Sequence, residues 1–157
     1  MTKKGAVHLD EKDRLILDLL QREGRISFAA LGRRVGLSPP AVAERVRRLE
    51  DLGVIRGYGA RVDLEALGYG VNALIELATD PVRYDAVWQY AEKEPRVREC
   101  YFVTGASSFI LRVVAPSIDG LRAVIEDLSA LGETRTSVVL KRPLIKETFL
   151  LEDAADL

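Results

Sequence analysis

The residues with the clearest chemical character are arginines, five of which fall between positions 33 and 48 beside a single glutamate. A guanidinium group presents a planar fork of N–H donors that matches phosphate oxygens and base edges. This density of arginine predicts a surface that binds a polyanion, with nucleic acid as the first candidate. The alternative is an amphipathic pair of helices whose basic face is only solvated.

A helix that begins after Ser38 would position these side chains. At 100° per residue, Val42, Val46 and Leu49 fall on one face, which should pack against a core. The opposite face is the one that a recognition helix presents to the major groove, with its first side chains near base edges and its later arginines near phosphates. The candidate DNA-binding residues are Arg34, Ser38, Pro40, Ala41, Glu44, Arg45, Arg47 and Arg48.

Two helices separated by about three residues, the spacing of a helix-turn-helix motif, are expected to hold this surface. Ser27 should cap the first helix, and Gly36 should end it, because glycine tolerates a positive φ. Ser38 should cap the second, with Pro39 at its first position, where the missing N–H costs nothing. A preceding helix, capped by Asp10 and ending near Glu23, completes the predicted motif.

The sequence argues against catalysis and metal binding. One cysteine, Cys100, and one histidine, His8, cannot form an internal disulfide or complete a zinc site. The sequence shows no nucleophile paired with a base and no phosphate-binding glycine loop, so we expect no enzymatic activity, no metal and no cofactor. It also has no apolar run near the length of a membrane span and no signal segment, so we expect a cytoplasmic protein.

Charge divides the chain into two parts. Residues 1–61 carry 13 Lys and Arg against 8 Asp and Glu, whereas residues 62–157 carry 10 against 16. A basic N-terminal part beside an acidic C-terminal part suggests that nucleic acid is bound at one end of the chain. We place a helix-turn-helix domain at 1–53, a linker or arm at 54–68 and a second domain at 69–157.

The second domain alternates strand and helix patterns. Its predicted strands lie near 71–77, 97–103, 109–114 and 136–141. Helical periodicity between them ends at Lys93 and at Gly132. The order βαββαβ is that of a ferredoxin-like fold, so the whole chain is predicted to be α+β. A four-stranded sheet with both helices on one face leaves its other face uncovered, which predicts a dimer or a higher oligomer.

Four fragments occur in order with a family-like spacing: LDEKDRLILDLLQREGRIS, LGRRVGLSPPAVAERVRRLEDLGVIRGY, VRECYFVTG and TRTSVVL. Through them the chain resembles the Lrp/AsnC family of feast/famine transcription regulators over essentially its full length. The resemblance implies a helix-turn-helix domain joined to a βαββαβ effector-binding and oligomerisation domain. It also implies double-stranded DNA as a partner, a homodimer that assembles further, often to an octamer, and an amino acid or related small molecule as effector.

The resemblance also implies where an effector would bind. In the family it lies between the effector domains of neighbouring dimers, at the turn after the second strand and near the fourth strand. The corresponding residues here are Thr104, Gly105, Ala106, Ser107, Ser108, Thr134 and Thr136. Backbone N–H groups at a glycine turn suit a carboxylate, and hydroxyl groups can hold either end of an amino acid.

This turn departs from the family pattern in one respect. Many relatives carry acidic residues there, whereas this chain has Ala106 and Ser108, so the turn offers no carboxylate to an ammonium group. A neutral hydroxyl binds a cation more weakly than a carboxylate does. Glu133 and Glu99 are the candidate replacements. Two alternatives stay open: a ligand-independent architectural DNA-binding protein of the same fold, and an amino-acid-metabolising enzyme.

Overall fold

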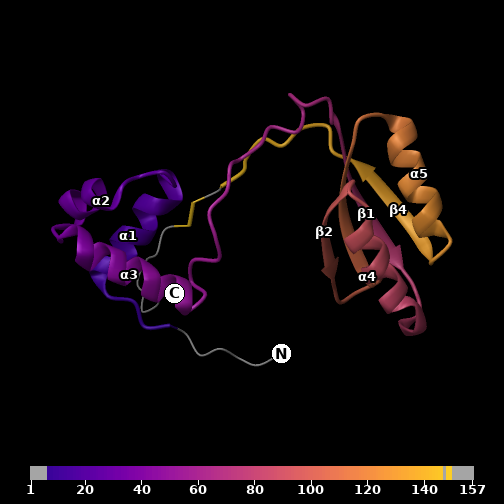
Figure 1. The fold of residues 1–157 in the computed structure, drawn as a ribbon. Helices are drawn as coiled ribbons and strands as arrows, with labels where there is room; N and C mark the ends of the chain where they lie inside the picture. The colour runs from indigo at the N-terminus through magenta and orange to yellow at the C-terminus, as the bar shows by residue number, and fades with distance from the viewer. Residues whose placement is uncertain (1–6, 147, 150–157) are drawn as a thin grey trace. The chain divides into compact units, whose positions relative to one another are not determined.

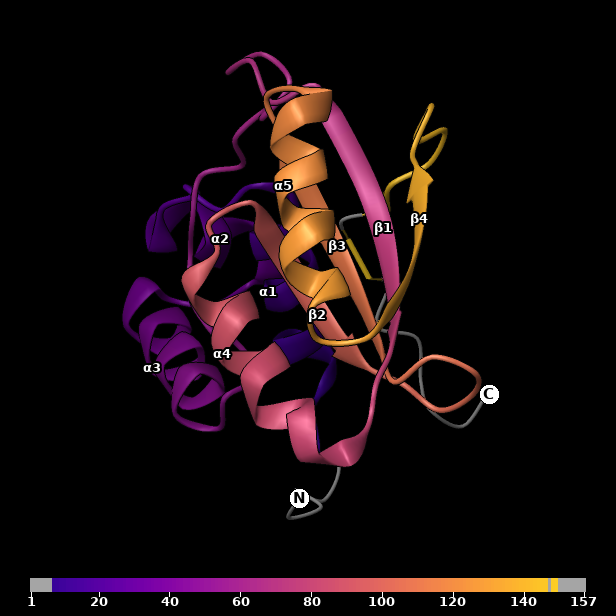
Figure 2. The ribbon, with the colours of Figure 1, turned by 90° about the vertical axis from the view of Figure 1, so that its right-hand side faces the viewer.

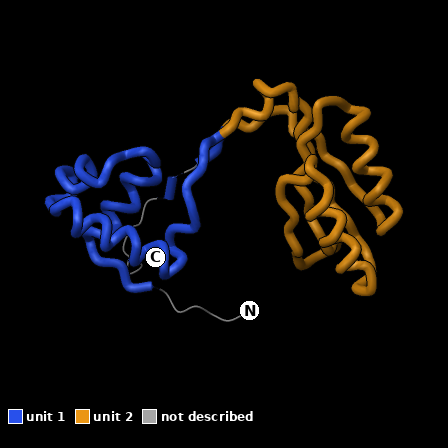
Figure 3. The backbone as a smooth tube through the Cα atoms, viewed as in Figure 1, with its two compact units in different colours: residues 1–61, 144–157 blue, residues 62–143 orange. Residues whose placement is uncertain are grey.

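The computed structural model describes residues 7–146 and 148–149 and divides the chain into two compact units (Figures 1 and 3). The first unit extends to Arg61, and the second is Val62–Pro143. The described residues after Pro143 group with the first unit, although the predicted second domain runs to 157. Two hydrogen bonds, of 2.7 and 3.0 Å, join Gln21 of the first unit to Phe149. The ends of the predicted domains, 1–6 and 150–157, lie outside the described residues.

The first unit contains three helices, α1 (Glu11–Arg22), α2 (Phe28–Val35) and α3 (Pro39–Asp51). Each begins where its cap was predicted. The side chains of Asp10, Ser27 and Ser38 accept a hydrogen bond from the backbone N–H three residues further on. The core between the helices contains Ile16, Leu17, Leu19, Leu31, Val35, Val42, Val46 and Leu49.

The turn between α2 and α3 depends on two glycines. Gly36 ends α2 in the left-handed region, with φ 70°, as its position predicted. Gly32 permits a close approach of the chain, because a Cβ there would lie 2.4 Å from the carbonyl oxygen of Leu37. The Lys12 ammonium group donates a 2.7 Å hydrogen bond to the Val35 carbonyl at the end of α2. These features hold α2 and α3 at helix-turn-helix spacing.

The second unit is the predicted ferredoxin-like fold. Its elements are β1 (Val71–Ala78), a short 3₁₀ turn (Pro81–Arg83), α4 (Tyr84–Lys93), β2 (Val97–Phe102), β3 (Phe109–Ala115), α5 (Ile118–Ser129) and β4 (Glu133–Val138). The strands form one antiparallel sheet in the order β2-β3-β1-β4. Helices α4 and α5 lie over the same face of this sheet (Figure 2). The core lies between the sheet and these two helices, and its fully buried residues include Phe109, Leu111, Val124 and Leu128.

Strand β4 lies earlier in the chain than the predicted range 136–141. It begins at Glu133, which pairs with Ala78 at the end of β1. Gly132 makes this early pairing possible, because a Cβ there would lie 2.3 Å from the Ala78 carbonyl oxygen. The close approach of the turn after α5 to the end of β1 is a tertiary contact, which explains why the sequence pattern alone misplaced the strand.

The sheet face opposite the helices is open, as predicted. Along β1, Ile75 and Leu77 are fully buried toward the helices, whereas Leu74 is 39% exposed. Tyr101 of β2 shares the open face and is 50% exposed. Polar and charged side chains lie between these apolar ones, so the open face is a mixed surface. No helix in the part of the chain that the structure describes is long and apolar enough to cross a membrane.

Candidate nucleic-acid interface and effector site

The outward face of α3 carries the predicted DNA-binding side chains. Pro40, Glu44, Arg47 and Arg48 are exposed, while Ala41 and Arg45 are partly buried. The apolar residues on the other side of α3 are buried against α1 and α2, as the helical phasing predicted. The arrangement is that of a recognition helix with its N-terminus and arginine-bearing side toward solvent.

Asp13 of α1, which is fully buried, fixes two of these arginines. One Asp13 oxygen lies 2.8 Å from Nη1 of Arg45, and the other lies 2.6 Å from Nη2 of Arg48. Arg45 also contacts Asp10 at 2.6 Å. A buried carboxylate needs such partners, because burial without them is costly. These ion pairs therefore orient α3 on α1, and they reduce the positive charge that Arg45 and Arg48 offer to DNA.

The pKa of Asp10 is lowered from its ordinary value, first by the hydrogen bond from the Asp13 backbone N–H and then by the hydrogen bond from Arg45. Asp10 therefore combines two roles, as the cap of α1 and as a partner of the recognition helix. The sequence predicted the first role from position alone. It could not show the second, because Arg45 is distant in the chain.

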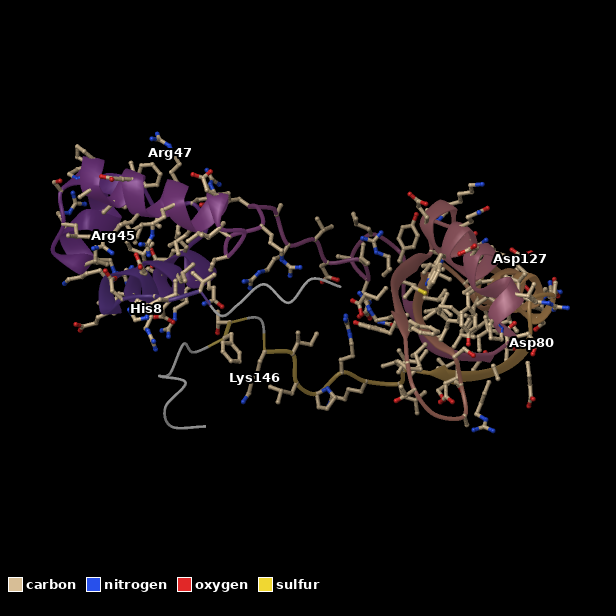
Figure 4. The ribbon with its side chains drawn as sticks, turned by 90° about the horizontal axis from the view of Figure 1, so that it is seen from below. His8, Arg45, Arg47, Asp80, Asp127 and Lys146 are labelled. Carbon is tan, nitrogen blue, oxygen red and sulfur yellow. The ribbon has the colours of Figure 1, made fainter. Side chains whose placement is uncertain are left out.

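Arg47 is the arginine of α3 that is most available to a ligand. Within residues 7–146 and 148–149 its side chain has no ion pair, and Figure 4 shows it directed away from the helices, whereas Arg45 lies against them. Arg34 is paired with Glu23 in a solvent-exposed ion pair. Arg33, which the list of candidates omitted, is exposed beside it. Of the arginines without an ion pair among the described residues, Arg47 was therefore among the sequence candidates and Arg33 was not.

In the second unit, the turn between β2 and β3 is closed by backbone hydrogen bonds. The Val103 N–H donates to the Ser108 carbonyl at 3.0 Å, and the Ser108 N–H donates to the Leu77 carbonyl at 2.9 Å. The Ser108 hydroxyl donates to the Thr79 carbonyl at 3.1 Å. Gly105 has a φ of 125°, which favours glycine. Thr104, Gly105 and Ala106 are exposed at the tip.

A small hollow of about 130 Å³ lies beside this turn, and its lining differs from the predicted set. It is lined by Glu76, Ala78, Ala106, Ser107, Glu133, Thr134 and Arg135. Ala106, Ser107 and Thr134 were predicted from the family resemblance. Glu76 and Arg135 were not, and they come from the neighbouring strands β1 and β4.

The register of β4 explains which of its side chains face the hollow. Thr136 pairs with Ile75, and Thr134 pairs with Leu77, both of which point toward the helices. The Thr134 hydroxyl accordingly contacts the Ser129 hydroxyl of α5 at 3.1 Å. Because side chains alternate along a strand, Arg135 lies on the other, open face. Arg135 lines the hollow, whereas Thr136 is not among the residues that line it.

Glu99, one of the two candidate replacements for an acidic turn residue, is already engaged. It forms a 2.7 Å ion pair with Arg112 and accepts a 2.5 Å hydrogen bond from the Tyr101 hydroxyl. Arg112 first, and then Tyr101, lower the pKa of Glu99. It does not line the hollow beside the turn. Glu133, the other candidate, does line it but is exposed at the start of β4.

Together these features define a class of protein. A helix-turn-helix unit with an outward arginine-bearing helix is joined to a ferredoxin-like unit that has a small polar hollow beside a glycine turn. This is the architecture of a DNA-binding transcription regulator with a separate ligand-binding domain.

Comparison with known proteins identifies the family. Residues 9–50 match the AsnC-type helix-turn-helix domain, and residues 72–149 match the Lrp/AsnC ligand binding domain. The chain is 34% identical to the HTH-type transcriptional regulator LrpC of Bacillus subtilis, over 83% of this chain and 91% of that protein. It is also 34% identical to the leucine-responsive regulatory protein of Escherichia coli K12, over 88% and 89% respectively. The chain belongs to the Lrp/AsnC family of transcription regulators.

Solved structures agree with this assignment. The structure of B. subtilis LrpC matches with a TM-score of 0.84 at 33% identity, over 89% of this chain and 100% of that chain. A Neisseria meningitidis transcriptional regulator in complex with L-methionine matches with a TM-score of 0.84 at 28% identity, over 96% and 100%. The predicted fold class, a helix-turn-helix domain followed by a ferredoxin-like domain, is therefore confirmed.

Proposed function

We propose that this protein regulates transcription by binding double-stranded DNA through α3, under the control of an amino acid or related small molecule bound by the second unit. The observation that carries the DNA part is the outward face of α3, where Arg47 is unpaired among the described residues while Asp13 orients the helix. The effector part is supported by the hollow beside Gly105 and by the L-methionine complex of the similar N. meningitidis protein.

The eight predicted DNA-binding residues divide into three groups in this proposal. Arg47 reaches bases or phosphates directly, with Ser38, Pro40, Ala41 and Glu44 near the groove at the start of α3. Arg45 and Arg48 chiefly hold α3 in place, although the half-exposed Arg48 side chain keeps donors for a phosphate. Arg34 flanks them and is partly neutralised by Glu23.

Replacement of Arg47 tests the DNA interface. Arg47→Ala should weaken binding to a selected operator by about 1 to 3 kcal/mol if the side chain reads a base. If it contacts only a phosphate, the dependence of affinity on salt should become shallower instead. Fluorescence anisotropy with operators selected from genomic fragments, measured at several salt concentrations, distinguishes the two cases.

Arg122→Ala is the matched control for this experiment. Arg122 is an exposed arginine of α5, paired with Asp119 and Glu126, and it lies in the other unit. The substitution Arg122→Ala removes the same charge as Arg47→Ala but leaves α3 unchanged, so the DNA affinity should stay nearly the same. Equal affinity and equal salt dependence for Arg47→Ala and the wild type would contradict the assignment of this face to DNA.

A ligand-independent architectural protein is the second candidate, since the turn carries Ala106 and Ser108 in place of acidic residues. Titration of the twenty common amino acids separates the two proposals. An effector-controlled regulator should change its DNA affinity or its oligomer size with at least one of them. An architectural protein should change neither.

We further propose that the protein acts as a homodimer or a larger assembly in the cytoplasm. A single helix-turn-helix makes few base contacts, so two or more copies of α3 must be presented together to specify a site. The open face of the sheet, with exposed Leu74 and Tyr101, offers a surface for that assembly. A chromosomal DNA partner places such a regulator in the cytoplasm.

A further inference from the structure

The open face of the sheet carries a pair of opposite charges beside the glycine turn. Glu76 of β1 and Arg135 of β4 are directly opposite each other in the antiparallel register. Cross-strand neighbours of this kind have Cβ atoms about 4.5 to 5.5 Å apart. Even so, the structure contains no ion pair between these two described side chains, and Arg135 is exposed. The two charges are thus adjacent but not used to neutralise each other.

Glu76 is held in place by the turn. Its Oε2 accepts a 3.2 Å hydrogen bond from the Ser107 hydroxyl. Glu76 is partly buried between its neighbours Ile75 and Leu77, which point the other way into the core. Strand pairing on both sides of β1 therefore fixes the position of this carboxylate. A carboxylate with one serine donor retains capacity to accept further hydrogen bonds.

Both side chains line the hollow of about 130 Å³ described above. This is room for the head group of an amino acid, an ammonium and a carboxylate on one carbon atom, with the side chain directed outward. The hollow contains an anion and a cation on neighbouring strands, which is the charge pattern complementary to that head group.

We propose that Glu76 binds the α-ammonium group of an amino acid effector and that Arg135 binds its α-carboxylate. Glu76 thereby replaces the acidic residue that the turn lacks at Ala106 and Ser108. Charge-assisted hydrogen bonds from an ammonium to a carboxylate, and from a guanidinium to a carboxylate, are about twice as strong as neutral ones. The inference rests on the proposed effector function and names the chemistry of its site.

The other carboxylates near the turn fit this role less well. Glu99 is already bound to Arg112 and Tyr101, and it does not line the hollow. Glu133 lines the hollow but is exposed, and its neighbour across the strand pair is Ala78 rather than a cation. Glu92 of α4, an exposed carboxylate that does not line the hollow, provides the matched control for Glu76.

Isothermal titration calorimetry on the full chain tests the proposal. Each of the twenty common L-amino acids is titrated, and the tightest binder is compared with its N-acetyl derivative and its decarboxylated amine. The wild type should prefer the amino acid over both analogues by at least about tenfold, since each analogue lacks one charge. Glu76→Gln should lose about tenfold in affinity for the amino acid and lose its preference over the N-acetyl derivative. Arg135→Gln should lose the preference over the amine.

Glu92→Gln should bind the amino acid as the wild type does. Circular dichroism and DNA binding of every variant show whether it is folded. Wild-type affinity in Glu76→Gln, or a loss in Glu92→Gln that equals the loss in Glu76→Gln, would overturn the assignment while leaving the effector function intact. If no amino acid binds the wild type, both the inference and the effector function are wrong. DNA binding, measured on the same samples, would still test the regulator itself.

Discussion

Asp13 shows how a single residue can serve both the fold and the recognition surface. Its backbone N–H bonds to the Asp10 side chain at 2.8 Å, and its side chain accepts from the Asp10 N–H at 3.3 Å, which closes the capping box of α1. The same carboxylate binds Arg45 and Arg48 of α3. The single carboxylate of Asp13 therefore caps the start of α1 and also binds the middle of α3.

Asp13→Asn should destabilise the protein by about 2 to 4 kcal/mol. Both carboxylate oxygens accept from an arginine, so an amide nitrogen in either orientation would face a guanidinium group. Urea unfolding at neutral pH measures the effect. Asp18→Asn, which removes a partly exposed i,i+4 partner of the exposed Arg22, is the control and should cost less than about 0.5 kcal/mol. Similar losses in both variants would show that the buried ion pairs do not hold α3.

At the scale of elements, Arg96 joins three parts of the second unit. Its guanidinium group binds both oxygens of Glu94 at 2.6 and 2.7 Å, just after α4, and donates a 2.7 Å hydrogen bond to the Gly120 carbonyl at the start of α5. Arg96 itself lies immediately before β2. Both covering helices are thereby fastened to the same strand, which stabilises the helix-covered side of the sheet.

Because of this cluster, the free energy of unfolding depends on pH. The hydrogen bond from Arg96 holds the pKa of Glu94 below its ordinary value. A carboxylate with a depressed pKa in the folded state contributes stability above its unfolded pKa and loses it as the pH falls through the folded value. Glu94→Gln should therefore cost about 1 kcal/mol at pH 7 and progressively less below about pH 4.

Urea unfolding of the wild type and of Glu94→Gln at pH 7 and at about pH 3 measures this difference. The exposed Glu92 of the same helix supplies a control, since Glu92→Gln should change stability by less than about 0.5 kcal/mol at either pH. A destabilisation of Glu94→Gln that stays constant across this range would mean that the charge of Glu94 does not contribute.

At the scale of the whole molecule, the open face of the sheet is the surface whose role remains a proposal. Its middle rows contain Leu74 of β1, which pairs with Arg112, and Ile110 of β3, which pairs with Tyr101 of β2. Two of these side chains are substantially exposed, and charged residues surround them. Such a mixed face suits association with a second copy of the same face, because an isologous contact pairs each patch with itself.

Leu74→Glu should shift the assembly toward the monomer. The substitution would place a carboxylate at the centre of an interface between two copies, where it would lie close to its counterpart in the other copy. Sedimentation velocity over a range of protein concentrations measures the change, and circular dichroism checks the fold. Val82→Glu, which changes an even more exposed apolar residue outside the sheet, is the control and should keep the wild-type assembly. An unchanged assembly in Leu74→Glu would exclude this face as the contact.

Local signals in the sequence determined the elements and their order. Capping residues, helical periodicity and Gly36 act over three or four positions, so they predicted α1, α2 and α3 closely. Period-two alternation with turn residues likewise predicted βαββαβ. The arginine-bearing face of α3 followed from the phasing of one helix. The assignment of DNA-binding and effector-binding residues to these surfaces remains a prediction.

The tertiary structure decided which charges meet. Asp13 binds Arg48 across 35 positions of the chain, and Ser107 binds Glu76 across 31, separations over which no sequence pattern specifies a partner. Local sequence patterns likewise do not specify the register between strands. A shift of one position turns every side chain to the other face, so the pairing of Glu76 with Arg135, and the placement of Thr136 toward the helices, could be known only once β4 was docked on β1.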